Sequence, residues 1–422
     1  MMEILTAVAA MLILQTQDPK PEPKQEPPKP QGLVIESGEW KIKFYGFARL
    51  DLQYDDSKPN DPQLPQWIRS EDPTAPAAIR ADEDDAQFNM HPKLTRFGIE
   101  VTGPSIEALG GAKTSGKIEV DFYGGTTSES RAALRMRHAF VKLAWETTAL
   151  TMGQREDLIA PLMPIVNNDM VMWNAGNLGD RRPQIRFEYM PKMGDGQVFL
   201  QAMLGLTGAI DNQSLDGGVG AASLDGVDAA SPTLQVRAAY KGPHLWLAGK
   251  TFEIGVWGHI AQEELSKDAV ASPPINGEDS WDSQVFGLDL TLPVVEGLEI
   301  QAEWFTGKNL DDVRGGIGQG VNVTAADPNL GDEIESSGGW IQAGYRASEA
   351  WTVYFGYTLD DPDSGLPAAA ARDKNLVFYF ANRIKVGPVT FGADYLNWTT
   401  EWSGGFEDGT DNRFNFFAQY NF

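Results

Sequence analysis

Apolar and polar residues alternate along much of the chain after residue 40. In WKIKFYGFARLDLQY, residues 40–54, every second residue from Trp40 to Tyr54 is apolar or small, and most residues between them are polar. This is the period of a β-strand, whose side chains point to opposite faces in turn. An apolar face with an aromatic residue at each end is typical of a strand that faces lipid. The segment therefore predicts a membrane-facing strand.

The same pattern recurs and predicts about sixteen strands. We expect them near residues 40–54, 93–103, 116–124, 133–146, 148–155, 183–190, 197–207, 233–241, 244–257, 281–292, 297–307, 338–347, 350–359, 374–386, 388–399 and 411–422. Tight links such as KGPH and RASEA alternate with long polar loops, which include 55–92, 156–182, 208–232, 258–280, 308–337 and 360–373. Outer-membrane barrels have this alternation, with short turns toward the periplasm. The predicted fold class is all-β, a transmembrane antiparallel β-barrel of about 16 strands, closed because lipid leaves no partner for an open backbone edge.

The N-terminal region differs from the rest. Residues 1–14, MMEILTAVAAMLIL, form an apolar run too short to span a bilayer, which fits a signal peptide even though its start carries Glu3 and no Lys or Arg. A buried N-terminal helix is the alternative. Residues 18–32 are rich in Pro and Lys, a composition that favours an extended spacer. We expect a signal peptide at 1–17, a Pro-rich periplasmic linker at 18–38 and the barrel at 39–422.

Composition and charge narrow the function. The chain has no cysteine, which excludes disulfides and thiolate metal sites. Its net charge of −25 argues against nucleic acid and against docking by charge on anionic lipid headgroups. Much of the acidity falls in the expected loops, at Asp311, Asp312, Asp360 and Asp361 among others, where we expect it to face water. The alternative is a divalent-cation site at DDPDSG, residues 360–365, which faintly resembles a calcium loop but lacks its bidentate Glu.

The third long loop is too apolar to lie in water. Its sequence, REDLIAPLMPIVNNDMVMWNAGNLGDRR over residues 155–182, carries many Leu, Ile, Val and Met side chains. We expect it to fold into the lumen and narrow the pore. Guanidinium groups there would favour carboxylate or phosphate solutes, because their donors match those anions. The alternative is that the arginines only pair with neighbouring acids. The charged residues at the ends of this loop and on the next strand are Arg155, Asp157, Asp180, Arg181, Arg182 and Arg186.

Other charged residues are predicted to face the lumen, where they brace the wall in pairs. The basic residues among them include Arg49, Arg237, Arg383 and Arg413. The fourth strand, ALRMRHAFVKLAW, does not keep one register, because Arg135 and Arg137 share their parity with apolar residues further on. A β-bulge near His138 would explain this change.

The chain ends in FNFFAQYNF, residues 414–422, which alternates up to the last residue. This predicts a last strand that closes the barrel against 40–54, with Tyr420 and Phe422 toward lipid near the periplasmic rim. Phe417 departs from the alternation, and we expect it to pack against the third loop.

The chain resembles the DcaP-like family of trimeric outer-membrane porins. The segments that carry the resemblance are FYGFARLDLQYD (44–55), RFGIEVTGP (96–104), GKIEVDFYGG (116–125), LRMRHAFVKL (134–143), MGQ (152–154), AGNLGDRRPQIRFEY (175–189) and the terminal Phe422. The resemblance implies a sixteen-stranded barrel, a homotrimer, and passage of small anionic solutes through an arginine-lined constriction. It assigns that constriction to Arg135, Arg137, Arg155, Arg181, Arg182 and Arg186. Separately, the aromatic end, Tyr420 and Phe422, resembles the signal by which bacterial outer-membrane barrels are recognised for assembly, so the barrel assembly machinery is an expected partner. The Pro-rich region replaces the coiled-coil segment that members of the family can carry.

A passive porin for small hydrophilic anions is therefore the expected function, in contact with outer-membrane lipid and with no cofactor or metal. Within this class, a phosphate-selective or non-selective channel is the alternative. A barrel enzyme would need a Ser–His pair, yet the chain has 4 His and no G-x-S-x-G motif. A soluble secreted β-protein that binds sugar through exposed Trp residues is the other alternative.

Overall fold

The computed structural model describes residues 32–422, apart from 83–84, 126–129, 169, 211–212, 214, 216–224, 266–278 and 325–326. The expected signal peptide at 1–17 lies outside the described residues, as does most of the linker at 18–38, so both stay predictions. Leu33–Ser37, at the end of that linker range, forms strand β1, which pairs with the start of the next strand from Leu33 opposite Phe44 to Ser37 opposite Trp40.

The chain forms a closed antiparallel β-barrel of sixteen strands. These strands are β2 (Trp40–Asp55), β4 (Arg96–Ile106), β5 (Ala112–Asp121), β6 (Arg135–Ala144), β7 (Thr148–Glu156), β8 (Arg181–Tyr189), β10 (Gly196–Gly205), β11 (Thr233–Pro243), β12 (Thr251–Glu264), β13 (Ser280–Val295), β14 (Leu298–Lys308), β15 (Glu335–Arg346), β16 (Trp351–Ser364), β17 (Arg372–Val386), β18 (Val389–Trp402) and β19 (Gly409–Asn421). The short strands β3 (Gln87–His91) and β9 (Lys192–Met193) add to the same sheet, and the helical turns are η1 (Glu107–Leu109), α2 (Asp225–Asp228), η2 (Asp311–Val313) and η3 (Gly316–Gly318).

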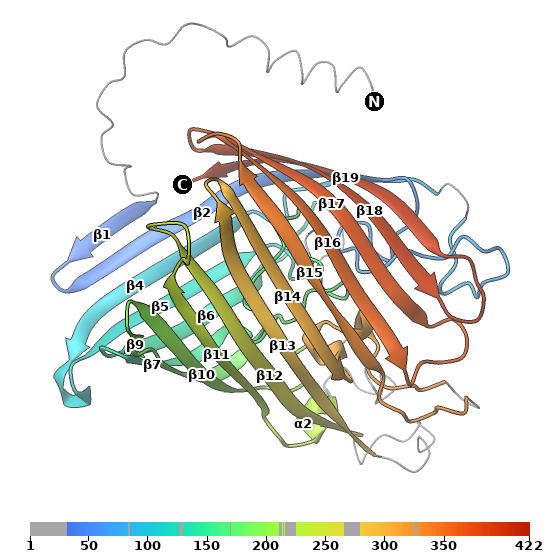
Figure 1. Cartoon of the computed structure of the whole chain (residues 1–422), viewed down its shortest axis with the longest axis horizontal. Coiled ribbons are helices and arrows are strands. Elements are labelled where there is room, and N and C mark those ends of the chain that lie inside the picture. The colour runs from blue at the N-terminus through green and yellow to red at the C-terminus, as the bar shows by residue number, and fades with distance from the viewer. Residues whose placement is uncertain are drawn as a thin grey trace, which may run out of the picture. The chain divides into compact units, whose positions relative to one another are not determined.

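The barrel closes between its first and last strands, as the sequence predicted. β19 pairs with β2 from Phe414 opposite Tyr54 to Asn421 opposite Phe47. In Figure 1 the red strand β19 lies beside the blue strand β2. The expected alternation of short turns and long loops is also present, so the long loops gather at one end of the barrel (Figure 1). In the described part of the chain, no helix is long and apolar enough to cross a bilayer.

Apolar side chains cover the outside of the barrel. On β10 Leu200 and Leu204 are exposed, and on β13 Phe286 and Leu288 are exposed. Their neighbours in sequence point inward, because successive side chains of a strand face opposite sides. The outer surface therefore has the apolar character that a bilayer requires.

One predicted strand was displaced. We expected a strand at 244–257, whereas β12 starts at Thr251. The link before it is a longer turn, in which the backbone N–H of His244 donates to the carbonyl oxygen of Lys250 (2.8 Å). Gly249 supplies the positive φ of 76° that this turn requires. Leu245 is 82% exposed at the tip of this turn. The prediction was wrong here because apolar residues in the turn have the sequence pattern of a strand.

The expected bulge in the fourth barrel strand is present. Glu119 of β5 pairs with His138 of β6, and the next residue of β5, Val120, pairs with Met136. Arg137 is therefore the extra residue, and the ladder changes parity there. Because of the bulge, Arg137 and His138 are both buried on the inner side, whereas Met136 is exposed outside.

Much of the core lies inside the barrel, where three long loops pack against the inner wall. We define the first loop as residues 56–95, the third as 157–180 and the sixth as 309–334. In one cluster, loop residues meet aromatic and aliphatic wall residues of β17 and β18; its members are Ile68, Val166, Met172, Ala175, Val377, Tyr379, Ala381, Leu396 and Trp398. A second cluster joins the third and sixth loops to β12–β14; its members are Ile159, Ala160, Leu178, Trp257, Val285, Phe305, Leu310 and Val313. Full burial of each such aliphatic or aromatic side chain contributes about 1.5–3 kcal/mol.

The inward folding of the sixth loop corrects our expectation for its acidic residues. Asp311 and Asp312 are buried rather than solvated. The carboxylate of Asp312 accepts a hydrogen bond from the backbone N–H of Gly208 (2.7 Å). Asp360 lies in β16 rather than in a loop, is also buried, and accepts from the hydroxyl of Ser336 (2.7 Å). Among the described residues, no group of His, Asp or Glu is arranged to hold a metal ion.

Candidate pore constriction

The third loop is tied to the inner wall by its own backbone. Along its length, successive backbone N–H groups donate to inward-pointing side chains of strands remote from its own. These pairs are Leu158 with Gln235 of β11, Leu162 with Glu303 of β14, Ile165 with Gln342 of β15 and Asn167 with Asp394 of β18. Backbone donors need partners when they are buried, and the polar wall residues supply them. The third loop, which is too apolar in sequence to lie in water, is thus held against strands β11 to β18 and not only against β7 and β8, the two strands that it connects.

An ion pair closes the base of this loop. Nε of Arg182 lies 2.6 Å from Oδ1 of Asp157, and its Nη2 lies 3.0 Å from Oδ2. Arg182 also donates to the carbonyl oxygens of Leu206 (3.2 Å) and Asp312 (2.9 Å). Its side chain is 0% exposed, so it has no surface left for a solute. Asp157 and Arg182, both predicted to line the constriction, instead join the third loop to the wall and to the sixth loop.

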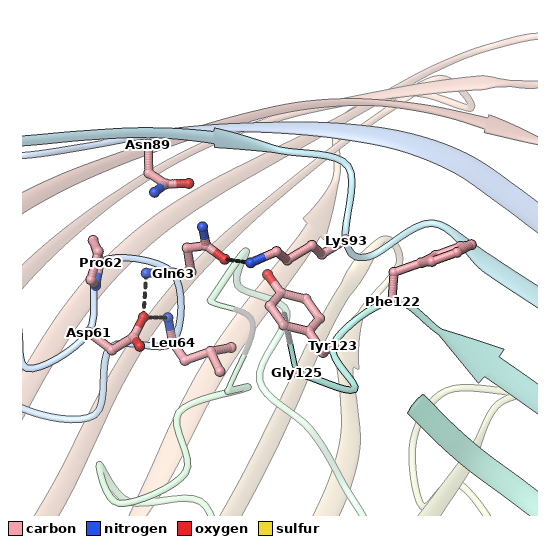
Figure 2. Close-up of a pocket in the computed structure, with 9 residues that line it drawn as sticks. All are labelled: Asp61, Pro62, Gln63, Leu64, Asn89, Lys93, Phe122, Tyr123 and Gly125. Atoms are coloured by element: carbon pink, nitrogen blue, oxygen red, sulfur yellow. Dashed lines mark hydrogen bonds between the residues drawn. The ribbon is translucent and has the colours of Figure 1, made fainter. Parts of the chain in front are cut away.

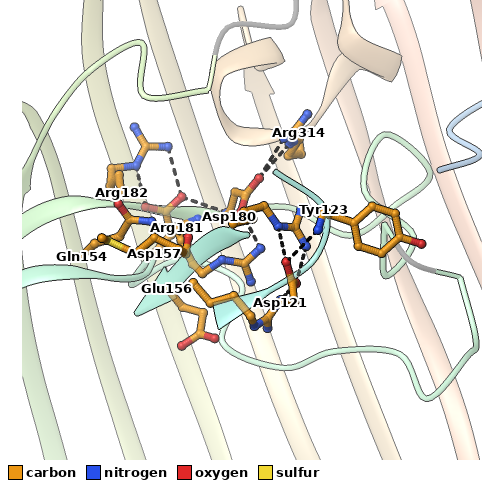
Figure 3. A network of polar contacts seen from close by, with 12 residues as sticks. Asp121, Tyr123, Gln154, Glu156, Asp157, Asp180, Arg181, Arg182 and Arg314 are labelled. Atoms are coloured by element: carbon orange, nitrogen blue, oxygen red, sulfur yellow. Dashed lines mark hydrogen bonds and ion pairs between the residues drawn. The ribbon is translucent and has the colours of Figure 1, made fainter. Parts of the chain in front are cut away.

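A second group of charges lies where the third and sixth loops meet. The carboxylate of Asp180 pairs with Arg181 (3.3 Å) and with Arg314 of the sixth loop (2.8 Å). Both guanidinium groups lie against Trp173, at 5.6 and 5.3 Å from its ring. One carboxylate therefore serves two cations (Figure 3). The two cations also share one aromatic surface, the ring of Trp173.

The adjacent strands β5 and β6 carry a similar arrangement. Arg135 binds Asp121 through two bonds of 2.9 and 2.6 Å, and Arg137 lies 3.1 Å from the same carboxylate. Arg137 also binds Glu119 (2.8 Å). The guanidinium of Arg135 lies 5.2 Å from the ring of Tyr123, which fixes its plane. The side chain of Arg135 is 29% exposed, so it keeps a face toward solvent.

These two groups adjoin each other. A cavity of about 370 Å³ is lined by Arg135, Asp180, Arg181 and Arg314 together. Arg181 and Arg135 also repel each other electrostatically, as cations at close range do. We define the arginine cluster as Arg135, Arg137, Arg181 and Arg314. Asp121 and Asp180 each serve two of its four guanidinium groups, and Glu119 also serves Arg137, so the described ion pairs give four cations three carboxylates.

The overall architecture matches solved outer-membrane proteins. The outer membrane channel DcaP of Acinetobacter baumannii superimposes with a TM-score of 0.66 at 20% identity, covering 93% of this chain and 100% of that one. An anion-selective porin from Comamonas acidovorans gives 0.54 at 11% identity, covering 91% and 100%. OmpT of Vibrio cholerae gives 0.54 at 12% identity, covering 92% and 100%.

The fold is that of an outer-membrane porin. The expected likeness to DcaP-like channels is thus confirmed at the level of the fold. Comparison with models of protein families and with curated proteins found no match.

In this porin barrel the two remaining residues predicted for the constriction, Arg155 and Arg186, differ in the contacts that their guanidinium groups make. Arg155 contacts Thr151 at 3.5 Å and lies 5.5 Å from the ring of Phe140. No described acidic side chain lies within ion-pair distance of it. Arg186 is buried and donates to the side chain of Gln184 (3.0 Å) and to a backbone carbonyl. Arg155 therefore adds positive charge near the pore, whereas Arg186 supports the wall.

The other predicted lumen arginines are each paired on the inner wall. Arg237 binds Asp289, Arg413 binds Asp55, Arg49 binds Asp51 and Arg383 binds Asp394. Phe417, which we expected to pack against the third loop, is buried and faces inward between two of them. Its ring lies 3.7 Å from the guanidinium of Arg49 and 5.1 Å from that of Arg383. Arg49 in turn donates to Asn167, so the link between Phe417 and the third loop runs through an arginine.

The aromatic end of the porin barrel lies on its outer side. Tyr420 is exposed, and Phe422 exchanges two backbone hydrogen bonds with Gly46 of β2 (3.2 and 3.1 Å). The ring of Phe422 lies 6.0 Å from that of Phe97. A Cβ on Gly46 would lie 2.2 Å from the carbonyl oxygen of Arg96 on β4 and 3.1 Å from the ring of Phe422, so the close approach of the neighbouring strand requires glycine there and the terminal ring lies against the same position.

Sequence reasoning missed Arg314. It lies in DDVRGGIG, a stretch that we interpreted as part of an exposed acidic loop. A signal was present, because Leu310, Val313 and Ile317 give the sixth loop the same apolar excess that marked the third loop. All three are fully buried.

Proposed function

We propose that this protein is an outer-membrane channel for passive diffusion of small hydrophilic anions, with carboxylates as the preferred class. The observation that carries the proposal is the arginine cluster, in which Asp121 and Asp180 each serve two guanidinium groups. A fully neutralised guanidinium offers an anion little. One that shares its carboxylate keeps donors and net charge for a passing carboxylate or phosphate, whose geometry its planar fork matches.

Two further observations support the proposal. The outer side of the barrel exposes apolar side chains such as Leu200, Phe286 and Phe355, as a lipid-facing surface does. The similar protein from Acinetobacter baumannii is described as an outer membrane channel, and that from Comamonas acidovorans as anion-selective. A channel function is therefore consistent with both the surface and the fold.

We also propose that the protein assembles as a homotrimer and is inserted with the help of the barrel assembly machinery, which would read the end containing Tyr420 and Phe422. OmpT of Vibrio cholerae, which shares the fold with a TM-score of 0.52, has been solved in a trimer form. Unheated and heated samples on a denaturing gel test this part. A trimeric barrel migrates slowly until it is heated, whereas an unchanged mobility would contradict the proposed assembly.

The decisive experiment is a reversal-potential measurement in planar bilayers. In a gradient of potassium chloride, an anion-selective channel has a reversal potential close to the Nernst potential of chloride. Replacing chloride by acetate and then by phosphate ranks the permeability of these anions. We expect the permeabilities of chloride and acetate to exceed that of potassium. Dominant potassium current would refute the proposal, and phosphate permeating better than acetate would favour the phosphate-selective alternative.

A further inference from the structure

A second built site lies beside the arginine cluster and is not part of it. The cavity has a volume of about 380 Å³ and is lined by the first loop, by β3 and by the start of the second loop, residues 122–134; Asp61, Gln63, Asn89, Lys93, Phe122 and Tyr123 are its chemically distinctive residues. Ligand cavities range from about 300 to 1,000 Å³, so this one suits a small solute. Figure 2 shows Asp61, Gln63, Asn89, Lys93 and Tyr123 around one space, with the ring of Phe122 at its edge and turned outward.

The first loop is held in place around this cavity. The carboxylate of Asp61 accepts the backbone N–H groups of Gln63 and Leu64, both at 2.8 Å. The side-chain oxygen of Gln63 accepts a hydrogen bond from Nζ of Lys93 (2.7 Å). Both Gln63 and Lys93 are more than nine-tenths buried. The positions of the amide and of the ammonium group are therefore fixed before any solute arrives.

Two amides in this cavity have unused hydrogen-bonding capacity. Oδ1 of Asn89 is buried and has no hydrogen-bond partner among the described residues. Because Oδ1 of Asn89 is an acceptor and the amide nitrogen of Gln63 is a donor, the pair presents one of each. In Figure 2 both side chains point toward the same space. Buried polar atoms without a partner are uncommon, which indicates that a polar group fits there.

A hydroxyl group can bond to both amides, because it can accept a hydrogen bond from the amide nitrogen of Gln63 and donate one to Oδ1 of Asn89. The cavity also offers the rings of Phe122 and Tyr123 and the positive charge of Lys93, which lies 5.8 Å from the Tyr123 ring. Tyr123 is the same residue whose ring supports Arg135 of the arginine cluster. The ring of Tyr123 therefore contacts both this cavity and the arginine cluster, so a solute bound in the cavity lies next to the constriction.

We propose that this cavity binds hydroxylated carboxylates of monosaccharide size, that is sugar acids, on their way to the arginine cluster. The hydroxyl groups would bond to Asn89 and Gln63, the ring would lie against Tyr123, and the carboxylate would be drawn by Lys93 and Arg135. This inference rests on the proposed anion-channel function and names the solute class that the entrance selects.

The test compares three probes in single-channel recordings of the whole protein: D-glucuronate, hexanoate and glucose. Glucuronate and hexanoate share a carboxylate, and only glucuronate carries hydroxyl groups. We expect glucuronate to interrupt the current at concentrations about tenfold lower than hexanoate, with glucose weaker than glucuronate, which is the order expected for hydrogen bonds combined with charge. Equal interruption by glucuronate and hexanoate would overturn the inference.

The variant Asn89→Leu keeps the size of the side chain and removes both hydrogen-bonding groups. We expect the concentration of glucuronate needed for half-interruption to rise about tenfold, while hexanoate is unaffected. Asn397→Leu on the outer face of β18 is the matched control and should change neither value. If Asn89→Leu fails to form a heat-modifiable barrel, Asn89→Ala is measured instead. An unchanged value for glucuronate in the folded variant contradicts the inference.

The reversal potential separates this inference from the proposed function. A channel that prefers anions but shows no dependence of glucuronate binding on Asn89 overturns only the sugar-acid site. A channel that prefers cations overturns the proposed function and, with it, the inference that rests on it.

Discussion

Neutralising Arg181 and Arg314 together is the sharpest perturbation of the proposed selectivity. With Asp180 they form a group of net charge +1, because two cations share one carboxylate. The double variant Arg181→Gln, Arg314→Gln leaves Asp180 alone, so the local charge becomes −1. Gln is shorter than Arg but keeps a polar side chain that donates hydrogen bonds, so the loss of charge is the main change.

The size of the effect follows from Coulomb's law. An anion passing about 5 Å from a unit charge in water gains about 0.8 kcal/mol, and about 0.1 M salt lowers this to about 0.5 kcal/mol. A change of two charges is then worth about 1 kcal/mol, which is about a fivefold loss of anion preference. The opposite substitution, Asp180→Asn, should raise the preference, because it removes the only acid of this group.

The assay is the reversal potential in a potassium chloride gradient, read as the ratio of chloride to potassium permeability. Arg346→Gln, Lys250→Gln is the matched control, since both side chains are at the short-turn end of the barrel and the overall charge change is the same. The control should leave the ratio unchanged. If the double variant folds and its ratio also stays at the wild-type value, the arginine cluster does not select the anion.

Three other perturbations test separate parts of the structure. Deleting Phe422 should lower the yield of heat-modifiable barrel without changing the conductance of channels that insert, because its contacts lie at the seam; equal yields would contradict this. Asp157→Asn should destabilise the protein by about 3–5 kcal/mol, because it removes the ion-pair partner of the fully buried Arg182; thermal loss of the unheated gel band measures this, and an unchanged transition would refute it. Phe417→Leu should cost about 1–2 kcal/mol through lost cation–π contacts with Arg49 and Arg383 while anion preference is kept; a shifted preference would show that this ring lies in the solute path.

The barrel itself could be predicted because its cause is local and repeated. Alternation of side chains, as from Trp40 to Tyr54, follows from the geometry of a strand in lipid, and it needs no knowledge of distant residues. The one displaced strand shows the limit of that signal. In the turn after β11, exposed Leu245 and Trp246 continued the alternation although the backbone had already turned.

The candidate site was predictable only in part, because it depends on contacts between loops. The acidic and basic residues of the third loop could be named from sequence, but their roles depend on burial and on their partners. Arg182 is fully buried in an ion pair with Asp157, whereas Arg181 pairs with Asp180 in the arginine cluster. Arg314 reaches the same carboxylate as Arg181 from a loop more than a hundred residues away. No local pattern reports such a meeting.

The bulge at Arg137 has a consequence for how such a pore can change during evolution. A regular strand offers the lumen one side chain in every two residues, yet here two consecutive residues, Arg137 and His138, both face inward. Losing the single codon for Arg137 would remove one cation and restore a regular ladder, with Arg135 still opposite Asp121 and Met136 still facing outward. Pore charge in this strand can therefore be gained or lost by a change of length, and every neighbouring side chain keeps its face.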